Sequence, residues 1–488
     1  MAGDVVLARW VVEADIHDGF VALSGDTNPL HTDPLAARRM PFGRVTVHGV
    51  HLALEALDRV VATTDRVPSR VRATFRRPVG VGDVVTTEIE THEHVATARL
   101  TVDRLPVAEL RVDLEQRRAG RTTLAPVELS RLPEQRSAIE RRLDDLIGLT
   151  GSEPLHGDRP AIVERFPRIA DRLDPVTVAE FLAATRLIGM EVPGLHSLLS
   201  SFDVTIGDVP IGDVTIGDVT IGTPDALAET KLGYSVDTVD DRFWRVVIDL
   251  DGPTLQGIVT AFVRPAPIDQ VIDTSIVSRN EFAGIRALVI GGSRGLGAAA
   301  VQLLAAGGAD VRLTYRSGAD DAARVAAGSG ASVFAFDADR DLDGVQQALR
   351  AVTHDGWWPT HLGWFASPPI FVGGRESYSE ELFERFRRIY VDAFLATVGQ
   401  LDPERLQGVL WPSSEAAATA VAGLAEYGDA KRLGESACHE LAAAHPGLVV
   451  DVTRFPRLRT DQTASIVPVE ADDPAPHVLA ALRRFASG

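Results

Sequence analysis

The chain has 488 residues, and its content of 45% apolar and 24% charged residues is typical of a globular protein with buried cores. The formal net charge of −19 disfavours general binding to nucleic acid or to an anionic membrane, because the overall field repels polyanions. The single cysteine, Cys438, excludes an internal disulfide and suits a reducing cytoplasm. No apolar stretch reaches the about 20 residues that cross a bilayer, so we expect a cytoplasmic protein with no membrane partner. The length of the chain predicts roughly three domains.

Residues 1–130 combine one helical segment with stretches of β character. The apolar spacing of HGVHLALEALDRVV (48–61) predicts a helix. The stretch DVVTTEIETHEHVATARLTV (83–102) alternates in the manner of a half-exposed antiparallel strand. Residues 131–160 are charged and contain proline, which predicts a connector with a short helix near residues 137–149.

Residues 161–268 repeat this plan weakly. A helical segment, VAEFLAATRLIGM (178–190), precedes strand-like segments that include KLGYSVDTV (231–239) and LQGIVTAFVRP (255–265), and we interpret the repetition as an internal duplication. Between them, DVTIGDVPIGDVTIGDVTIG (203–222) has a period of five that fits neither helix nor strand. We interpret it as an inserted loop or hairpin rather than a repeat-built binding surface, because so few copies stack poorly.

The pattern changes in the third region, residues 278–488. The apolar run RALVIGG (286–292), the helical AAAVQLLAAGG (298–308) and the strand-like ADVRLTYRS (309–317) follow one another. Strands that alternate with helices predict βαβ units and a parallel sheet. The sequence therefore predicts a multidomain chain in which α+β regions precede an α/β domain.

The stretch SGDTNPLHTD (24–33) brings an acid and an imidazole close together. Turn-forming residues between them allow Asp26, Asn28 and His31 to converge, and a carboxylate beside an imidazole can handle one proton. Gly49 lies at the expected start of a helix, where a backbone N–H is a good donor to a carbonyl oxygen that gains negative charge. These groups suit proton chemistry next to a thioester carbonyl. The alternative is that Asp26 caps a helix and His31 only stabilises the loop.

These residues stand in FVALSGDTNPLHTDPLAARRMPFGRVTVHG (20–49), which resembles the signature of the MaoC-like (R)-specific enoyl-thioester hydratases and dehydratases. FRRPVGVGD (75–83) matches a further segment of that family, and the resemblance covers about residues 8–125. It implies a hot-dog fold, in which an antiparallel sheet wraps around one long helix. In this family, two side chains bind a water and add it across a C2–C3 double bond, or remove it.

The resemblance also implies roles for single residues. Asp26 and His31 would be the catalytic pair, and Asn28 would support them. The Gly49 amide would polarise the thioester carbonyl. The second region has Arg186 but no acid–His pair, so residues 161–268 resemble the non-catalytic half of a double hot-dog that forms a groove for the acyl chain. His196 stands where the helix would start, and we expect it to be structural.

A second group of residues lies in the third region. IGGSRGLG (290–297) follows an apolar run, and its glycines let the backbone approach a pyrophosphate whose charge a helix N-terminus favours. EYGDAK (426–431) places Tyr427 and Lys431 on one face of a helix. The ammonium is expected to lower the pKa of the phenol toward neutrality. Ser414 precedes Tyr427 by thirteen residues.

This set resembles the short-chain dehydrogenase/reductase family over about residues 280–488. The resemblance implies a Rossmann-like, doubly wound parallel sheet. It also implies that Ser414 holds the substrate oxygen, Tyr427 transfers the proton and Lys431 orients the nicotinamide ribose. Ser413 is a weaker candidate for the first role.

The choice of cofactor rests on charges near the second strand. Arg316 and Ser317 stand where an NAD enzyme usually carries an acidic residue for the ribose hydroxyl. Arg294 adds a second guanidinium, and two of them suit a 2′-phosphate, so NADPH is favoured over NADH. Asp337 resembles the adenine-contacting residue of the family. The expected cofactor-binding residues are Gly291, Ser293, Arg294, Gly295, Leu296, Gly297, Arg316, Ser317, Asp337, Ala366, Tyr427 and Lys431.

Two stretches depart from the reductase pattern. WFASPPI (364–370) stands where the family usually has Asn-Ala-Gly. Tyr390 or Asp392 occupies the neighbourhood in which the family places an Asn on the next helix. We therefore expect a different proton relay.

The two resemblances share one substrate, since a reductase makes the 3-hydroxyacyl thioester from which a dehydratase removes water. We expect a bifunctional ketoreductase and dehydratase that acts on 3-oxoacyl and 3-hydroxyacyl thioesters in fatty-acid-like or polyketide biosynthesis. One alternative is a hydratase joined to a 3-hydroxyacyl-CoA dehydrogenase that works in the direction of β-oxidation. Another is an acyl-binding scaffold with one inactive site.

The two resemblances also suggest partners. Coenzyme A or an acyl carrier protein would carry the thioester, no metal is expected, and a homodimer is an expectation from the reductase resemblance. An arginine cluster near the first motif would bind phosphate or an acidic carrier protein. The alternative is that the cluster is only a basic face exposed to solvent. The cluster consists of Arg38, Arg39, Arg44, Arg76 and Arg77.

Overall fold

The structure is a computed structural model that describes residues 4–40, 42–116, 136–207, 231–339, 342–371, 378–464 and 469–487. It divides into two compact units. The first holds Met1–Arg38, Arg44–Ala266 and Ser465–Pro468, and the second holds Arg39–Gly43, Pro267–Ala464 and Val469–Gly488. In the described part of the chain, no helix combines the length and the apolar character needed to cross a membrane. Residues 208–222 of the pentapeptide segment lie outside the described residues.

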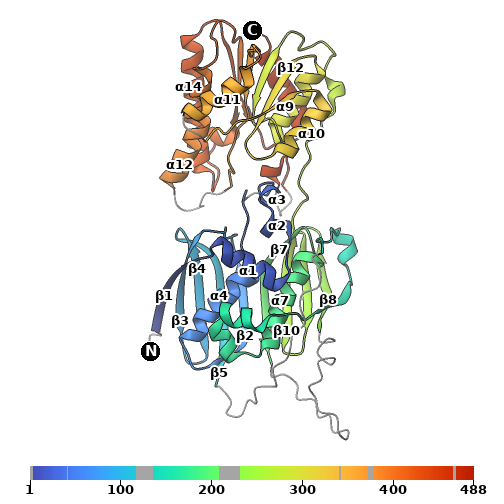
Figure 1. Cartoon of the computed structure of the whole chain (residues 1–488), viewed down its shortest axis with the longest axis vertical. Coiled ribbons are helices and arrows are strands. Elements are labelled where there is room, and N and C mark those ends of the chain that lie inside the picture. Colours follow the sequence, from blue (N-terminus) through green and yellow to red (C-terminus); the bar gives the residue numbers. More distant parts are fainter. Residues whose placement is uncertain are drawn as a thin grey trace. The chain divides into compact units, whose positions relative to one another are not determined.

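The first unit is built on one ten-stranded sheet with the order β1-β3-β4-β5-β2-β7-β10-β9-β8-β6 (Figure 1). All neighbouring strands pair antiparallel, and the β2–β7 pair joins the first five strands to the last five. The strands are β1 (Asp4–Val11), β2 (Val67–Phe75), β3 (Val84–Thr91), β4 (Val95–Val102), β5 (Leu105–Glu115), β6 (Thr150–Pro154), β7 (Ser197–Ile206), β8 (Lys231–Asp240), β9 (Arg245–Asp251) and β10 (Leu255–Val263).

Two long helices lie against this sheet. The helix predicted at 48–61 is α4 (Gly49–Ala62), which contacts β2–β5, and the helix predicted at 178–190 is α7 (Pro175–Met190), which contacts β6, β7, β8 and β10. Asp174 caps α7 through the Val176 amide, and every residue from Val176 to Met190 is buried. One apolar core runs through both halves of the sheet and both helices. Shorter helices are α1 (Ala14–Ser24), α2 (Pro29–Thr32), α3 (Pro34–Ala37), α5 (Arg159–Arg165) and α6 (Pro167–Arg172).

Three expectations for this part of the chain need correction. The stretch 83–102 is a hairpin of β3 and β4 rather than one strand, because His92 and its neighbours turn the chain. The helix predicted near 137–149 is only a 3-10 turn, Leu143–Leu146. The predicted connector also contributes β6, which pairs with β8 at the edge of the sheet.

The second unit has a six-stranded parallel sheet with the order β13-β12-β11-β14-β15-β16. This order reverses direction between β11 and β14, which is the usual site of ligand binding in open α/β sheets. The parallel sheet predicted from the alternating pattern is therefore confirmed. The strands are β11 (Arg286–Ile290), β12 (Asp310–Tyr315), β13 (Ser332–Ala335), β14 (His361–Trp364), β15 (Gly408–Ser414) and β16 (Val449–Phe455).

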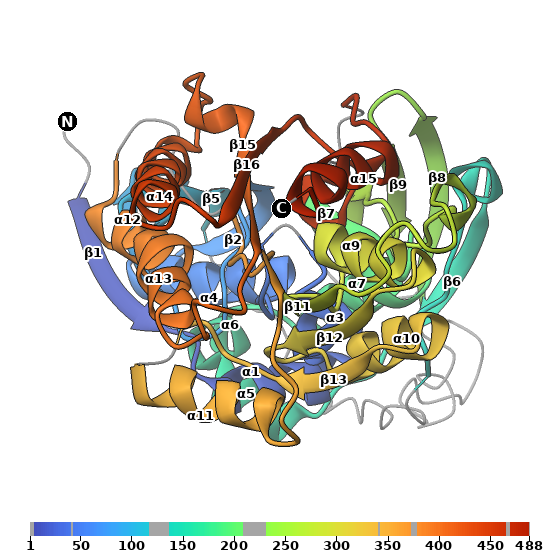
Figure 2. The ribbon, with the colours of Figure 1, turned by 90° about the horizontal axis from the view of Figure 1, so that it is seen from above.

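Helices cover both faces of this parallel sheet (Figure 2). One apolar core includes α9 and α15, and the other includes α11, α13 and α14. A π-helical turn, Arg388–Asp392, interrupts the helical stretch between α12 and α13, and such turns often mark functional sites. The helices are α9 (Gly295–Ala306), α10 (Ala319–Ser329), α11 (Leu342–Thr353), α12 (Glu380–Arg387), α13 (Ala393–Val398), α14 (Ala425–Ala444) and α15 (Pro474–Phe485), with 3-10 turns at Thr274–Ile276, Glu415–Ala417 and Asp461–Thr463.

Candidate active sites

The loop after α1 is shaped by caps at both ends. Gly25 ends α1 in the left-handed conformation, with a φ of 69° that glycine adopts without strain. Asn28 then caps α2, because its Oδ1 accepts a hydrogen bond from the Leu30 amide at 3.0 Å. Asp33 caps α3 in the same way through the Leu35 amide. The predicted turn thus forms, and it holds Asp26 between two helices.

The second half of the first unit anchors this loop. The Asn28 Nδ2 donates to the carbonyl oxygen of Gly189 at 2.7 Å, and it lies 3.3 Å from the carbonyl oxygens of Gly194 and Leu195. These acceptors lie at and beyond the C-terminal end of α7, far away in sequence. Asn28 therefore supports the loop, and the half of the unit without an acid–His pair helps to position it.

Asp26 is buried, with 1% of its surface exposed. Its Oδ2 accepts a hydrogen bond from the Thr185 hydroxyl at 2.9 Å, and its Oδ1 accepts one from the Asn28 amide at 3.3 Å. Gly189 makes room for this carboxylate, because a Cβ at that position would overlap with it. Burial raises the pKa of Asp26, and the nearby His31 and the Thr185 hydroxyl oppose that rise. The Asp26 carboxyl group can therefore exchange a proton at a higher pH than an ordinary, exposed aspartate can.

His31 is held as a neutral imidazole. Its Nδ1 lies 2.7 Å from the carbonyl oxygen of Thr46, which can only accept, so Nδ1 carries the hydrogen and Nε2 keeps a lone pair. Burial, followed by the neighbouring His48, lowers the pKa of His31 to about 3. A neutral imidazole with a free lone pair can accept a hydrogen bond or a proton from water.

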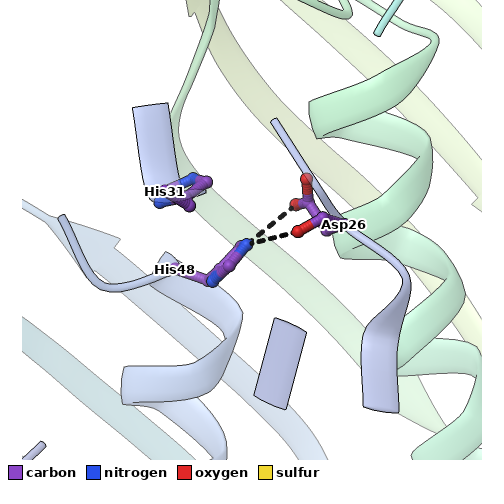
Figure 3. Close-up of side chains that lie close together, drawn as sticks. All are labelled: Asp26, His31 and His48. Carbon is purple, nitrogen blue, oxygen red and sulfur yellow. Dashed lines mark hydrogen bonds and ion pairs between the residues drawn. The ribbon is translucent and has the colours of Figure 1, made fainter. Parts of the chain in front are cut away.

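His48 is a third member of this site that we did not predict. Its ring stacks on His31 with the centroids 3.7 Å apart, and its Nε2 lies 3.1 Å from the Asp26 carbonyl oxygen and 3.5 Å from Asp26 Oδ2 (Figure 3). The sequence contained a signal, since His48 directly precedes Gly49 in the quoted motif. His48 thus links Asp26 and His31. One side-chain oxygen or nitrogen atom of each of the three residues lies within 4.8 Å of the other two.

A carboxylate and two imidazoles are also a donor set for metal ions. The His48 Nε2 faces a carbonyl oxygen, however, so it carries a hydrogen and offers no lone pair to a metal in this arrangement. The geometry therefore favours acid–base chemistry over metal binding at Asp26, His31 and His48.

Gly49 is the first residue of α4, where a backbone N–H has no acceptor within the helix. A Cβ at this position would lie within 2.9 Å of Leu199 from β7 and within 3.3 Å of Phe75 at the end of β2. Apolar side chains from both halves thus crowd the amide that we expect to polarise a thioester carbonyl. The packing explains why a glycine stands there.

Arg186 and His196 occupy positions outside this group. Arg186 donates to the Ser24 carbonyl oxygen at 2.7 Å and to Glu153 at 2.5 Å, and so ties the end of α1 to β6. His196 pairs with Glu140 at 3.0 Å. Both contacts join separate segments of the chain, which fits structural roles.

Two arginines of the cluster predicted to receive phosphate are already paired. Arg44 forms a two-pronged ion pair with Asp83, at 2.7 Å for each contact. Arg39 contacts Asp269 at 2.7 Å and Asp461 at 3.2 Å. Carboxylates therefore compete with phosphate at these two positions.

In the second unit, the glycine-rich turn follows β11 and opens α9. Gly291 has a φ of 82°, and its amide donates to the Thr314 hydroxyl at 3.1 Å. A Cβ at Gly297 would overlap with the Gly291 carbonyl oxygen, and one at Gly291 would lie 2.7 Å from the Ala366 amide nitrogen. These close approaches require glycine and leave a backbone cradle at the N-terminus of α9 that fits a pyrophosphate. Ser293, Gly295 and Leu296 lie in the same turn.

The other predicted cofactor residues follow neighbouring strands. Arg316 and Ser317 come after β12, Asp337 after β13 and Ala366 after β14, so all lie at the carboxyl edge of the sheet. Arg294 lies near the positive charge of Arg316 and 3.7 Å from Asp461, and burial lowers its pKa. The placement suits a dinucleotide across this edge.

Ser414, Tyr427 and Lys431 come together as their spacing predicts. Ser414 ends β15 and its side chain contacts that of Tyr427, while Lys431 lies one turn further along α14 and donates to the Pro412 carbonyl oxygen at 2.7 Å. The expected direction of the Tyr427 pKa is wrong: burial raises the pKa to about 12, although the hydrogen bond with Ser414 lowers it. Burial also lowers the pKa of Lys431 to about 7.

Aromatic rings surround the Lys431 ammonium. The Nζ lies 3.8 Å from the centroid of the Tyr390 ring and 4.4 Å from that of Trp411. The Tyr390 hydroxyl, in turn, lies 2.7 Å from the Ser367 hydroxyl. Tyr390 therefore contacts the lysine through its ring face.

Ser413, the weaker candidate for holding substrate, is engaged elsewhere. Its hydroxyl donates to Glu435 at 2.5 Å, and Glu435 also pairs with Arg454. Ser414 is thus the serine that is placed beside Tyr427.

Known proteins resemble parts of this chain. Residues 5–106 match the sequence model of the family described as MaoC like domain. A 3-hydroxybutyryl-CoA dehydratase of Methylorubrum extorquens is 32% identical over 98 residues, which are 19% of this chain and 61% of that protein. An (R)-specific enoyl-CoA hydratase of Aeromonas caviae is 40% identical over 74 residues, 14% of this chain and 55% of that protein.

Two further likenesses are shorter or weaker. A cyclic-di-GMP-binding biofilm dispersal mediator protein of Escherichia coli is 49% identical over 61 residues, which are 12% of this chain and 26% of that protein. The structure of a short chain dehydrogenase from Burkholderia cenocepacia, in complex with NADP, is 25% identical and covers 42% of this chain and 92% of its own, with a TM-score of 0.38.

The matched segments are short in comparison with the relatives themselves. The chain covers 61% or less of each of the three curated relatives, so their activities do not transfer as a whole. The family match coincides with the residues that carry Asp26, His31, His48 and Gly49. Residues 5–106 of this chain are therefore a MaoC-like domain.

Proposed function

We propose that the chain is a bifunctional enzyme that reduces 3-oxoacyl thioesters with NADPH and dehydrates the resulting 3-hydroxyacyl thioesters. The observation that carries the proposal is the cluster of Asp26, His31 and His48, with its acid and His48 buried, in a MaoC-like domain. Tethering a reductase to this site would raise the local concentration of the shared intermediate.

The dehydratase step uses two proton-handling groups and one amide. His31 Nε2 accepts a proton from water in the hydration direction, and the Asp26 carboxyl group exchanges the proton at C2. The Gly49 amide stabilises the negative charge that forms on the thioester oxygen. His48 contacts both Asp26 and His31, and Asn28 and Thr185 fix the loop and the carboxyl group.

We further propose that the first unit is a double hot-dog, with residues 1–130 as the catalytic half, 161–268 as the supporting half and 131–160 as a connector that adds one edge strand. Five strands of the sheet and one long helix that packs on them recur in each half: α4 contacts β2–β5, and α7 contacts β6, β7, β8 and β10, which supports the duplication. Residues 278–488 would form the reductase domain.

The reductase step would rest on Ser414, Tyr427 and Lys431. Tyr427 stays protonated at neutral pH, so it can give a proton to the substrate oxygen, and Ser414 orients that oxygen. Bound NADPH would supply the hydride. The glycine cradle of Gly291 and Gly297 would hold its pyrophosphate, while Arg294, Arg316 and Ser317 would hold the 2′-phosphate.

Other predicted contacts complete the cofactor site. Lys431 and Tyr427 would face the nicotinamide ribose, Asp337 the adenine, and Ser293, Gly295, Leu296 and Ala366 the phosphates and the nicotinamide. The reverse direction, hydration followed by oxidation, uses the same groups, and the curated relatives are named for both dehydration and hydration.

The first test is hydration of but-2-enoyl-CoA by the purified chain, followed by the loss of enoyl-thioester absorbance. We expect turnover that does not depend on nicotinamide. A chain that binds NADPH but hydrates neither this thioester nor its carrier-protein analogue would contradict the dehydratase assignment. Oxidation of NADPH by a 3-oxoacyl thioester, and its loss in Tyr427→Phe, would test the reductase separately.

A further inference from the structure

Arg264 is a buried cation without a carboxylate partner. It follows β10 directly, and 6% of its surface is exposed. Its Nη2 donates to the Leu195 carbonyl oxygen at 2.8 Å, but its Nε and Nη1 are buried without any hydrogen-bond partner among the described residues. Within that part of the chain, no carboxylate lies at ion-pair distance from it. Burial lowers its pKa to about 10, and no neighbouring charge opposes this.

The other buried arginines of the described residues are paired. Arg186 contacts Glu153 at 2.5 Å, and Arg312 contacts Asp355 at the same distance. A guanidinium keeps its charge in proteins and has five N–H donors, so leaving it buried and unpaired is costly. Among the described residues, Arg264 therefore keeps two N–H-bearing atoms, Nε and Nη1, that suit an anion.

Arg264 flanks the dehydratase site. Its Nη2 and the Asn28 Nδ2 approach the same acceptor, the Leu195 carbonyl oxygen, at 2.8 and 3.3 Å. Its backbone N–H donates to the carbonyl oxygen of His196, which directly precedes β7. Leu199 of β7 packs against the Gly49 position. Arg264 is thus connected through Leu195 and Asn28 to the loop of Asp26 and His31. Through His196 it is connected to β7, whose Leu199 packs beside the proposed donor amide of Gly49.

We propose that Arg264 binds a carboxylate at the far end of the acyl chain, so that the preferred substrates are thioesters of dicarboxylic acyl groups. This inference rests on the proposed dehydratase function. A carboxylate matches the planar, two-pronged donor geometry of a guanidinium. Its position beside the catalytic loop favours the acyl part of the substrate over the phosphates of the carrier arm.

The test compares two five-carbon enoyl groups on two carriers. Glutaconyl thioester ends in a carboxylate, and pent-2-enoyl thioester is its neutral counterpart. Each is offered on coenzyme A, which carries phosphates, and on N-acetylcysteamine, which carries none. We expect kcat/KM for hydration to favour the carboxylate substrate on both carriers by about tenfold or more.

Variants assign the preference to one residue. Arg264→Met should collapse the ratio of the two kcat/KM values to near one, and Arg264→Lys should restore part of it, because the charge returns without the two-pronged geometry. Arg242→Met, at an exposed turn, should keep the ratio of the unaltered chain. Thermal unfolding of each variant checks that it is folded.

The outcomes separate this inference from the proposed function. If the unaltered chain hydrates both enoyl groups equally, or if Arg264→Met leaves the ratio unchanged, the inference is wrong although the dehydratase stands. If Arg264→Met affects coenzyme A substrates but not N-acetylcysteamine ones, the anion is a phosphate and the inference is again wrong. If the chain hydrates neither group on either carrier, the proposed function itself fails.

Discussion

At the scale of single residues, the proposed dehydratase depends on the Asp26 carboxyl group. Asp26→Asn keeps the size of the side chain but removes the proton-exchanging group, so we expect enoyl-thioester hydration to fall by about 10²–10⁴-fold. Stopped-flow or steady-state measurement of the enoyl-thioester absorbance gives the loss of activity. Asp18→Asn, on the exposed side of α1, is the matched control. Equal activity of the two variants would remove Asp26 from the mechanism.

The Lys431 ammonium predicts how reduction depends on pH. Burial lowers its pKa from 10.5 to about 7, so the charged form is present below this pH and is lost as the pH rises through it. Tyr427 keeps its proton until about pH 12, so it does not explain a loss in this range. We expect NADPH-linked kcat to fall between about pH 7 and pH 9, by up to about tenfold per pH unit.

A conservative variant tests the assignment of that pH dependence. Lys431→Arg keeps a cation that does not titrate below about pH 12. Its remaining activity should therefore stay flat between pH 7 and pH 9. The same falling limb in this variant would show that another group controls the rate.

Residue spacing was enough to predict some of these groups and not others. Asp26 and His31 stand in one short loop, and Tyr427 and Lys431 are one helical turn apart, so local geometry brings each pair together. Thr185 and Gly189 reach Asp26 only through the packing of α7, which no local pattern reveals. The Tyr427 pKa was predicted in the wrong direction because its burial depends on the whole fold.

At the scale of elements, α7 supports a site that the first half carries. A Cβ on Gly189 would overlap with the Asp26 carboxylate, so Gly189→Ala should displace that group and reduce hydration by about tenfold or more. Gly19→Ala, in α1, is the control, because a Cβ there meets nothing within 4 Å. Enoyl hydration and NADPH oxidation are measured on both variants. Hydration that survives in Gly189→Ala would separate α7 from the catalytic site.

The elements themselves could be predicted where their patterns are long. The α4 and α7 helices have apolar periodicity over several turns, and both begin within three residues of the predicted positions. The short helix near 137–149 does not form, because isolated turns of charged residues gain little from packing. The role of β6 as an edge strand depends on its pairing with β8, which is a tertiary contact.

At the scale of the whole molecule, three histidines whose pKa values are lowered predict acid sensitivity. The pKa of His31 is lowered to about 3, and those of His48 and His51 lie well below 6.5, mainly because of burial. The unfolded chain binds protons at these positions below about pH 6.5 while the folded chain does not, so stability is lost as the pH falls. Each histidine contributes up to about 1.4 kcal/mol per pH unit, and the raised pKa of Asp26 acts in the opposite direction.

Thermal unfolding between pH 7 and pH 5 measures this effect. The midpoint should fall with the pH, and the fall should be smaller in His51→Phe. His51 already stacks on Phe20 with the ring centroids 4.2 Å apart, so an aromatic ring without a titrating group fits there. The same pH dependence in both proteins would mean that His51 is not kept neutral by the fold.

The central claim is that one chain joins reduction to dehydration. The most direct measurement offers a short 3-oxoacyl thioester to the purified chain with NADPH, and follows cofactor absorbance together with the masses of the products. We predict NADPH oxidation, a 3-hydroxyacyl intermediate and then an enoyl product, with the sequence stopping at the hydroxyacyl stage in Asp26→Asn. Absence of NADPH oxidation on both coenzyme A and carrier-protein thioesters, while enoyl hydration proceeds, would contradict the bifunctional account.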